Sequence, residues 1–158
     1  MSLASELAAL YRRDLARLLQ ELRAFPAGDT IWRKTPGMTN SPGNLTLHLE
    51  GNLREFIGRL IGNVAYTRRR DAEFALSGQP VAELIARIDE VSTLIPSILG
   101  DLTSAALDAD YPQPVLGSTL TVRQFIIHLN GHLNYHLGQI DAQRRALTGV
   151  GAIDLAGL

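Results

Sequence analysis

Apolar residues recur at intervals of three and four positions over four long segments of this chain. That spacing places them on one face of a helix, whereas a half-buried strand alternates every second residue. The predicted helices cover residues 3–24, 41–64, 80–99 and 121–147, and no segment shows a comparable strand pattern. The sequence therefore predicts an all-α protein, a four-helix bundle with a long loop between its first two helices.

Several helix ends carry recognisable signals. Ser41 and Pro42 have the residue types of an N-cap and a first helical position, and Thr121 with Gln124 forms a capping box before the fourth helix. Pro96 falls inside the third helical pattern. Because proline lacks a backbone N–H, we expect Pro96 to kink this helix or to break its last turns.

Composition limits the number of domains and the partners. With 158 residues, 46% of them hydrophobic, the chain fits one domain, which we expect at 1–150, followed by a loosely held C-terminal tail at 151–158. A net charge of −1 gives no attraction to nucleic acid, and the run 68–70 of three arginines is interpreted as a solvated turn. The N-terminal segment carries charges every few residues, which predicts no signal peptide or membrane span and a cytoplasmic protein.

Histidine and carboxylate are the available metal ligands, because the chain has no cysteine. His128, His132 and His136 follow one another at intervals of four residues in HLNGHLNYHLGQI. Each such step turns by about 40° on a helix, so at most two neighbours share one target. His136 lies inside the apolar arc, His132 at its edge and His128 towards the polar side, which selects the pair His132 and His136. Gln139 follows on the same edge, either as a hydrogen-bond partner of a ligand or in solvent.

A catalytic divalent site typically takes three protein ligands, so the third must come from another helix. The one remaining histidine is His48, at the edge of the apolar arc of the second predicted helix. Asn44, Asn52, Glu55 and Arg59 continue this edge at helical spacing. Such a polar strip is expected if the bundle encloses a polar cavity, and equally if the strip is exposed.

These features also have purely structural explanations. A histidine pair one turn apart is often an ordinary surface pair or a hydrogen-bonded core pair. Trp32 and Met38, both in the long loop, are typical of core or loop-anchoring groups as well as of substrate contacts. Glu55 and Arg59 form a helical ion pair of small energetic consequence unless Glu55 turns inward. Spacing alone does not establish a metal site.

Two segments, NSPGNLTLHLEGNLREFI and HLNGHLNYHLGQIDAQRR, resemble the DinB-like (YfiT-like) superfamily of metal-dependent enzymes, and specifically its branch with an NSPGNLxLHLxGNLR segment. The similarity spans nearly the whole chain. It implies a four-helix bundle, commonly a homodimer, in which one histidine of the second helix and an HxxxH pair before GQI bind a divalent metal. Carried over to this chain, the ligands are His48, His132 and His136. Leu137 stands where many members carry arginine.

The resemblance and the chemistry of such a site leave three functions open. Zinc or nickel on three neutral imidazoles would act as a Lewis acid on a small-molecule substrate. The reaction is then either hydrolysis, with Glu55 as proton acceptor, or transfer using a low-molecular-weight thiol. The third function is that of a non-catalytic, dimeric interaction protein whose metal is structural or adventitious.

A substrate pocket is expected between the second and fourth helices, roofed by the loop 32–44. Its walls and the surroundings of the metal are predicted to include Trp32, Met38, Asn44, Asn52 and Gln139. These side chains would offer apolar and amide contacts to a small molecule.

Overall fold

The computed structural model describes residues 2–153, which form helices joined by loops. In chain order the elements are α1 (Leu3–Arg23), η1 (Asp29–Trp32), α2 (Pro42–Leu53), η2 (Arg54–Arg59), α3 (Arg70–Ala75), α4 (Val81–Gly100), α5 (Ser104–Asp108) and α6 (Val122–Thr148). Of these, η1 is a 3-10 turn and η2 is π-helical. No strand forms within residues 2–153, where β-type pairing is limited to two isolated bridges. The predicted all-α class is confirmed.

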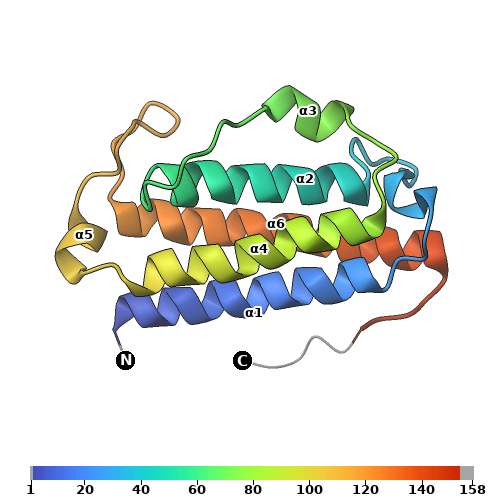
Figure 1. The fold of residues 1–158 in the computed structure, drawn as a ribbon, viewed down its shortest axis with the longest axis horizontal. Helices are drawn as coiled ribbons and strands as arrows, with labels where there is room; N and C mark the ends of the chain where they lie inside the picture. The colour runs from blue at the N-terminus through green and yellow to red at the C-terminus, as the bar shows by residue number, and fades with distance from the viewer. Residues whose placement is uncertain (1, 154–158) are drawn as a thin grey trace.

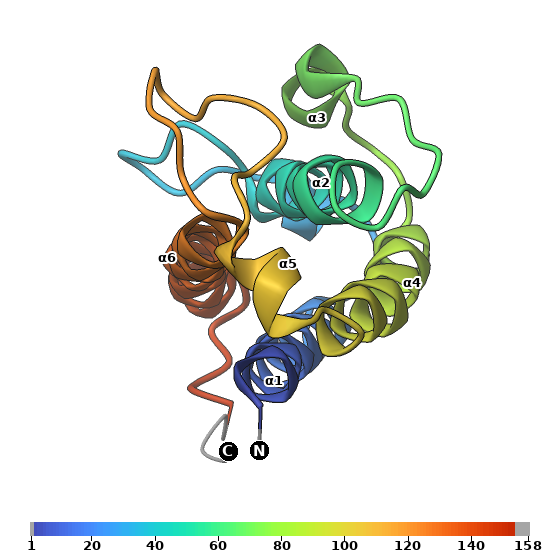
Figure 2. The ribbon, with the colours of Figure 1, turned by 90° about the vertical axis from the view of Figure 1, so that its left-hand side faces the viewer.

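The bundle consists of α1, α2, α4 and α6, which lie side by side (Figure 1). Viewed along their length, they surround a common interior, with α3 outside α2 and α5 across one end (Figure 2). Each helix contributes fully buried side chains to the core, among them Leu15, Leu49, Ile88 and Leu133. Since α2 and α6 are in contact, residues separated by more than half the chain become neighbours.

The predicted caps begin α2 and α6. The Ser41 side chain accepts from the Asn44 N–H at 3.2 Å, and Pro42 is the first residue of α2. Thr121 and Gln124 form the reciprocal capping box before α6. Each cap satisfies backbone N–H groups that the first helical turn leaves without partners. These local contacts explain why both starts were predictable from the sequence.

The second helix differs from the prediction after Leu53. We expected one helix to about residue 64, but the α-helix ends at Leu53 and a π-helical segment follows as far as Arg59. In that segment Tyr111 donates a hydrogen bond of 2.7 Å to the carbonyl of Phe56. A wide turn of this kind depends on contacts with distant parts of the chain, and the apolar periodicity carries no sign of it.

Pro96 does not break the third predicted helix. α4 runs without interruption from residue 81 to residue 100, with Pro96 buried inside it. The neighbouring Ile95 and Leu99 are fully buried. Their packing offsets the missing backbone hydrogen bond, so the predicted break is wrong.

Two short helices, α3 and α5, lie outside the four predicted helices. Helices of five or six residues have little stability of their own, so α3 depends on its packing against α2. The Asn44 side chain donates to the carbonyls of Glu73, at 3.1 Å, and Leu76, at 2.8 Å. At the start of α3, the arginine triplet 68–70 is only partly solvated: the Arg68 side chain is 13% exposed and pairs with Glu73. The prediction of a solvated turn is wrong for Arg68.

The chain after α6 begins in contact with the bundle. Arg144 is fully buried and pairs with Glu21 of α1. It also donates to the carbonyls of Val150, at 3.3 Å, and Gly151, at 3.1 Å. The predicted loose tail thus starts with an anchored residue, while its residues 154–158 lie outside the described residues. Within residues 2–153, none of the helices combines the length and apolar character needed to cross a membrane.

Candidate metal centre

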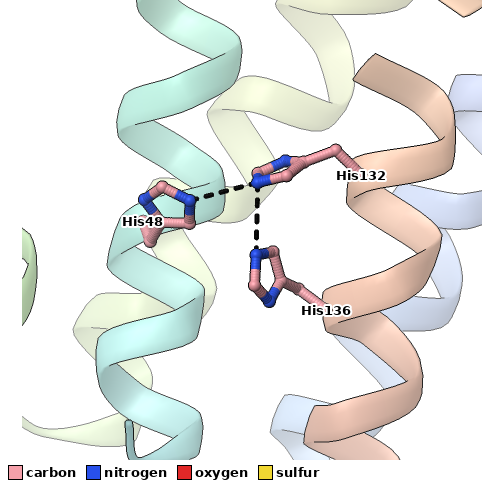
Figure 3. A group of neighbouring side chains, drawn as sticks. All are labelled: His48, His132 and His136. Carbon is pink, nitrogen blue, oxygen red and sulfur yellow. Dashed lines mark hydrogen bonds between the residues drawn. The ribbon is translucent and has the colours of Figure 1, made fainter. Parts of the chain in front are cut away.

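Three histidine side chains from two helices meet inside the bundle (Figure 3). His48 projects from α2, and His132 and His136 project from α6. The Nε2 atom of His132 lies 3.2 Å from Nε2 of His48 and 3.2 Å from Nε2 of His136. One ring nitrogen of each histidine lies within 4.8 Å of the other two. The structure therefore brings together the three residues predicted as ligands.

Of the three histidines of α6, two join the cluster and one does not, as helical geometry predicts. His132 and His136, one turn apart, are partly buried and face α2. His128 is exposed and stacks on the ring of Phe125, with 5.9 Å between the ring centroids. Because each step of four residues rotates the side chain further round the helix, the third histidine does not reach the cluster.

His48 has an ionised partner behind it. Its Nδ1 lies 2.9 Å from Oε2 of Glu73, and Arg68 holds the same carboxylate through contacts of 2.7 and 2.9 Å. Burial disfavours the charged carboxylate, but hydrogen bonds from His48 and Arg68 outweigh it and hold the pKa of Glu73 below its ordinary value. A carboxylate can only accept, so Nδ1 of His48 carries the proton and Nε2 turns its lone pair to the cluster.

Gly51 makes room for this carboxylate on the surface of α2. A Cβ atom at Gly51 would lie 2.1 Å from Oε1 of Glu73, far inside van der Waals contact. Glu73 can therefore reach His48 only because α2 has no side chain at this position. The same helix, α2, thus bears His48 and leaves the space at Gly51 that the Glu73 side chain occupies.

Gln139 plays the corresponding part for His136. The Oε1 atom of Gln139 lies 2.7 Å from Nδ1 of His136, while its Nε2 donates to the Tyr135 hydroxyl at 3.2 Å. With the amide oxygen accepting, His136 also carries its proton on Nδ1 and turns the lone pair of Nε2 inward. The structure thus selects the hydrogen-bonding role of the two that the sequence allowed for Gln139. By contrast, Nδ1 of His132 is buried and has no hydrogen-bond partner within residues 2–153.

Two histidines of the cluster, His132 and His136, lose their protons readily, which leaves nitrogen lone pairs that can bind a cation. Burial, together with the neighbouring His136 and His48, lowers the pKa of His132 to about 4. Burial also lowers the pKa of His136, against the opposing effect of its hydrogen bond to Gln139. Both rings are neutral at pH 7, the state in which imidazole binds a metal. Lone pairs of at least two rings then point at one place, an arrangement that a positive charge stabilises.

The spacing of the nitrogens fits a divalent ion. Ring nitrogens bound to one tetrahedral zinc at about 2.0–2.1 Å lie about 3.3 Å apart. Two of the pairs here are separated by 3.2 Å. The Glu73 carboxylate at Nδ1 of His48 and the Gln139 amide at Nδ1 of His136 are hydrogen-bond partners of the kind that commonly orient metal-binding histidines. The residues present therefore fit one divalent metal with three protein ligands.

The rest of the polar strip on α2 divides between the interior and the surface. Asn44 and Asn52 are buried, Asn44 holding α3 in place and Asn52 leaving its Oδ1 without a partner in the described part of the chain. Glu55 pairs with Arg59 at 2.5 Å, and this contact lowers the pKa of Glu55. The strip thus faces a polar interior around His48 and turns into a helical ion pair one turn later.

A pocket of about 210 Å³ opens beside His136. Met38, from the loop before α2, and Gln139, from α6, line it as predicted, together with the exposed side chain of Tyr135. Asn44 and Asn52 are not among its lining residues. The loop between α1 and α2 therefore covers the site through Met38 and its neighbours.

Trp32 anchors that loop and does not line the pocket. Its ring packs against Gly43 at the start of α2, where a Cβ atom would lie 2.5 Å from the ring. Its Nε1 donates to the carbonyl of Gln79 at 2.9 Å. These contacts support the loop-anchoring role of Trp32.

Glu73 and Arg68 are the members of the site that sequence reasoning missed. Glu73 lies on a six-residue helix, 25 positions after His48. Arg68 belongs to a triplet whose other members are exposed, so its sequence context resembles solvated surface. Only the packing of α3 on α2 brings the two residues to the histidines, and no local pattern encodes that packing.

Comparison with known proteins gives a family. A sequence profile described as the DinB superfamily matches residues 10–140, from within α1 to within α6, and so includes all three histidines. A search of the curated proteins gives no significant match. The match covers most of the chain and accords with the all-α bundle, from which we conclude that this chain belongs to the DinB superfamily.

Proposed function

We propose that the chain is a metal-dependent enzyme in which His48, His132 and His136 bind one divalent ion, zinc or nickel. The convergence of the three Nε2 atoms carries this proposal. It is supported by the hydrogen bonds of Glu73 and Gln139, which occupy the outward nitrogens of two of the rings. Three imidazole ligands are typical of catalytic zinc sites that keep one position open.

The chemistry divides between the ion and the chain. A divalent ion held by three neutral imidazoles supplies a Lewis acid with an uncompensated positive charge. Glu73, held by Arg68, keeps His48 in the tautomer that offers Nε2 and increases its basicity. Gln139 orients His136 in the same way without adding charge. The pocket beside His136 gives a small molecule access to the His136 side of the cluster.

Two classes of reaction use a site of this kind. One is hydrolysis of a small ester or amide, and the other is a transfer in which the positive site stabilises the thiolate of a low-molecular-weight thiol. The thiol has to come from a cosubstrate, since the chain has no cysteine. For hydrolysis, Glu55 stays the predicted proton acceptor, a role that requires its ion pair with Arg59 to open. The homodimer expected from the family resemblance also stays a prediction.

An activity screen tests the proposal. Metal-loaded and chelator-treated protein are compared on small esters and amides, and on low-molecular-weight thiols with an electrophile. We expect turnover of one class by the loaded protein, loss on chelation, recovery with zinc or nickel, and none with His132→Ala. His128→Ala, at the exposed histidine, is the matched control and should behave as wild type.

Circular dichroism of the chelator-treated protein distinguishes an enzyme from a non-catalytic protein with a structural metal. A structural metal has a closed coordination shell, and its removal unfolds the protein. Unfolding on chelation, together with no turnover of any substrate class, would therefore identify a structural metal in a non-catalytic protein. An enzyme site should lose activity while the helical signal persists.

A further inference from the structure

Within residues 2–153, the side chains that line the pocket beside His136 are uncharged. Its lining consists of the loop segment 37–40, Leu45 and Gln139, together with Tyr135 and His136. Met38, Leu45 and Tyr135 provide apolar surface, and the remaining polar groups are neutral amides and hydroxyls. No lysine, arginine or carboxylate of the described residues lines this pocket.

A neighbouring pocket shows that this is a property of the site and not of the whole surface. That pocket lies beyond the Glu73 carboxylate, between α2, the segment 66–76 and α4, and has a similar volume of about 210 Å³. Its lining includes Glu50, Glu73, Arg69 and Arg87. The charges close to the histidines thus lie on the far side of His48, where Arg68 neutralises Glu73.

The wall formed by the loop is held in place. Gln143 of α6 donates to the carbonyl of Asn40 at 3.2 Å and accepts from the N–H of Thr35 at 3.5 Å. The N–H of Met38 donates to the carbonyl of Thr35 at 3.1 Å, which closes a turn. These contacts hold the backbone of the loop at Met38, while the Met38 thioether can adapt to ligands of different shape.

We infer that the site accepts a small molecule with one metal-binding head and an uncharged body, and discriminates against bodies that carry a carboxylate or an ammonium group. This inference rests on the proposed metal binding. A charged body would lose hydration in the pocket without gaining a side chain of opposite charge among the residues that line it. The volume of about 210 Å³ lies below the range of about 300–1,000 Å³ typical of sites for drug-sized ligands, so the ligand is of fragment size.

Three hydroxamates with different tails test the inference on zinc-loaded protein by isothermal titration calorimetry. Butyrohydroxamate has an uncharged tail, succinic monohydroxamate a carboxylate, and β-alanine hydroxamate an ammonium group. We expect the uncharged probe to bind about tenfold more tightly than either charged probe. Equal affinities, tighter binding of a charged probe, or no binding of any probe to the zinc-loaded protein would overturn the inference. Failure of the protein to take up zinc, measured before the probes are added, would instead contradict the proposed function.

A variant with a charge in the pocket wall provides a second test of the inference. Met38→Lys should increase the affinity for the carboxylate probe by about tenfold relative to the uncharged probe. The matched control is Ile127→Lys, because Ile127 is exposed on α6 and lies on the face of the helix opposite His136. An unchanged ranking of the probes with Met38→Lys, in protein that still binds zinc, would show that the ligand does not occupy this pocket.

Discussion

At the residue scale, the outward nitrogen of each histidine determines what its inward nitrogen can bind. Glu73 gives His48 a charged partner, Gln139 gives His136 a neutral one, and Nδ1 of His132 has no partner in the part of the chain that the structure describes. The three imidazole rings therefore differ in basicity although they are chemically identical. Substituting a hydrogen-bond partner tests this difference while all three histidines remain.

Glu73→Gln should weaken zinc binding by about tenfold, because the amide keeps the size of the side chain but removes the charge that makes His48 more basic. Competition with a chromophoric chelator measures the dissociation constant. Glu83→Gln, at an exposed glutamate of α4, is the control. Equal zinc affinities for the two variants would contradict the role assigned to Glu73.

The stability of the metal-free protein should fall as the pH decreases from about 6.5 to about 4. The pKa of His132 is about 4 in the folded chain, against about 6.5 in an unfolded one. Between these values the unfolded chain binds the extra proton, so acid favours unfolding. Urea unfolding at about pH 7 and about pH 5 measures the loss, which should be smaller in His132→Gln. An equal loss in both proteins would assign the effect to other groups.

At the element scale, the features that could be predicted from the sequence are those that depend on residues close together in the chain. Ser41 and Thr121 mark the starts of α2 and α6 through contacts with residues three positions away, and the apolar period locates the long helices. The relative rotation of His132 and His136 follows from the same helical geometry. The π-helical segment, α3 and the Arg68–Glu73 pair depend on packing between distant segments, so the sequence predicted the three histidines of the cluster but not the charged pair that supports them.

Gly51→Ala tests how α3 is seated on α2. Alanine in a helix interior normally stabilises a protein by about 0.5–1 kcal/mol relative to glycine. Here the added Cβ would meet Glu73 at 2.1 Å, so we expect a net loss of about 1–3 kcal/mol and weaker zinc binding.

Gly131→Ala is the matched control for this substitution. Gly131 lies inside α6, and a Cβ atom there would meet nothing within 4 Å. Thermal or urea unfolding of both variants measures the difference. If Gly51→Ala stabilises the protein as much as Gly131→Ala does, the close approach of Glu73 to α2 is wrong.

At the scale of the whole molecule, the histidine cluster joins two helices that are neighbours only because the bundle folds. His48 and His132 are separated by 84 positions, and the loop bearing Met38 covers the side of the cluster next to His136. The site is therefore a property of the folded chain, and an ion bound there would link α2 to α6. Whether the three histidines bind an ion is the central question for every other proposal.

Metal content, measured by mass spectrometry on protein purified without a histidine tag, tests most directly whether the three histidines bind an ion. The three samples are wild type, His132→Ala and His128→Ala, each supplied with zinc or nickel and then dialysed. We predict about one equivalent of metal in wild type and in His128→Ala, and little in His132→Ala. Equal metal content in His132→Ala and wild type, or no metal in any of them, would contradict a metal centre at these three histidines.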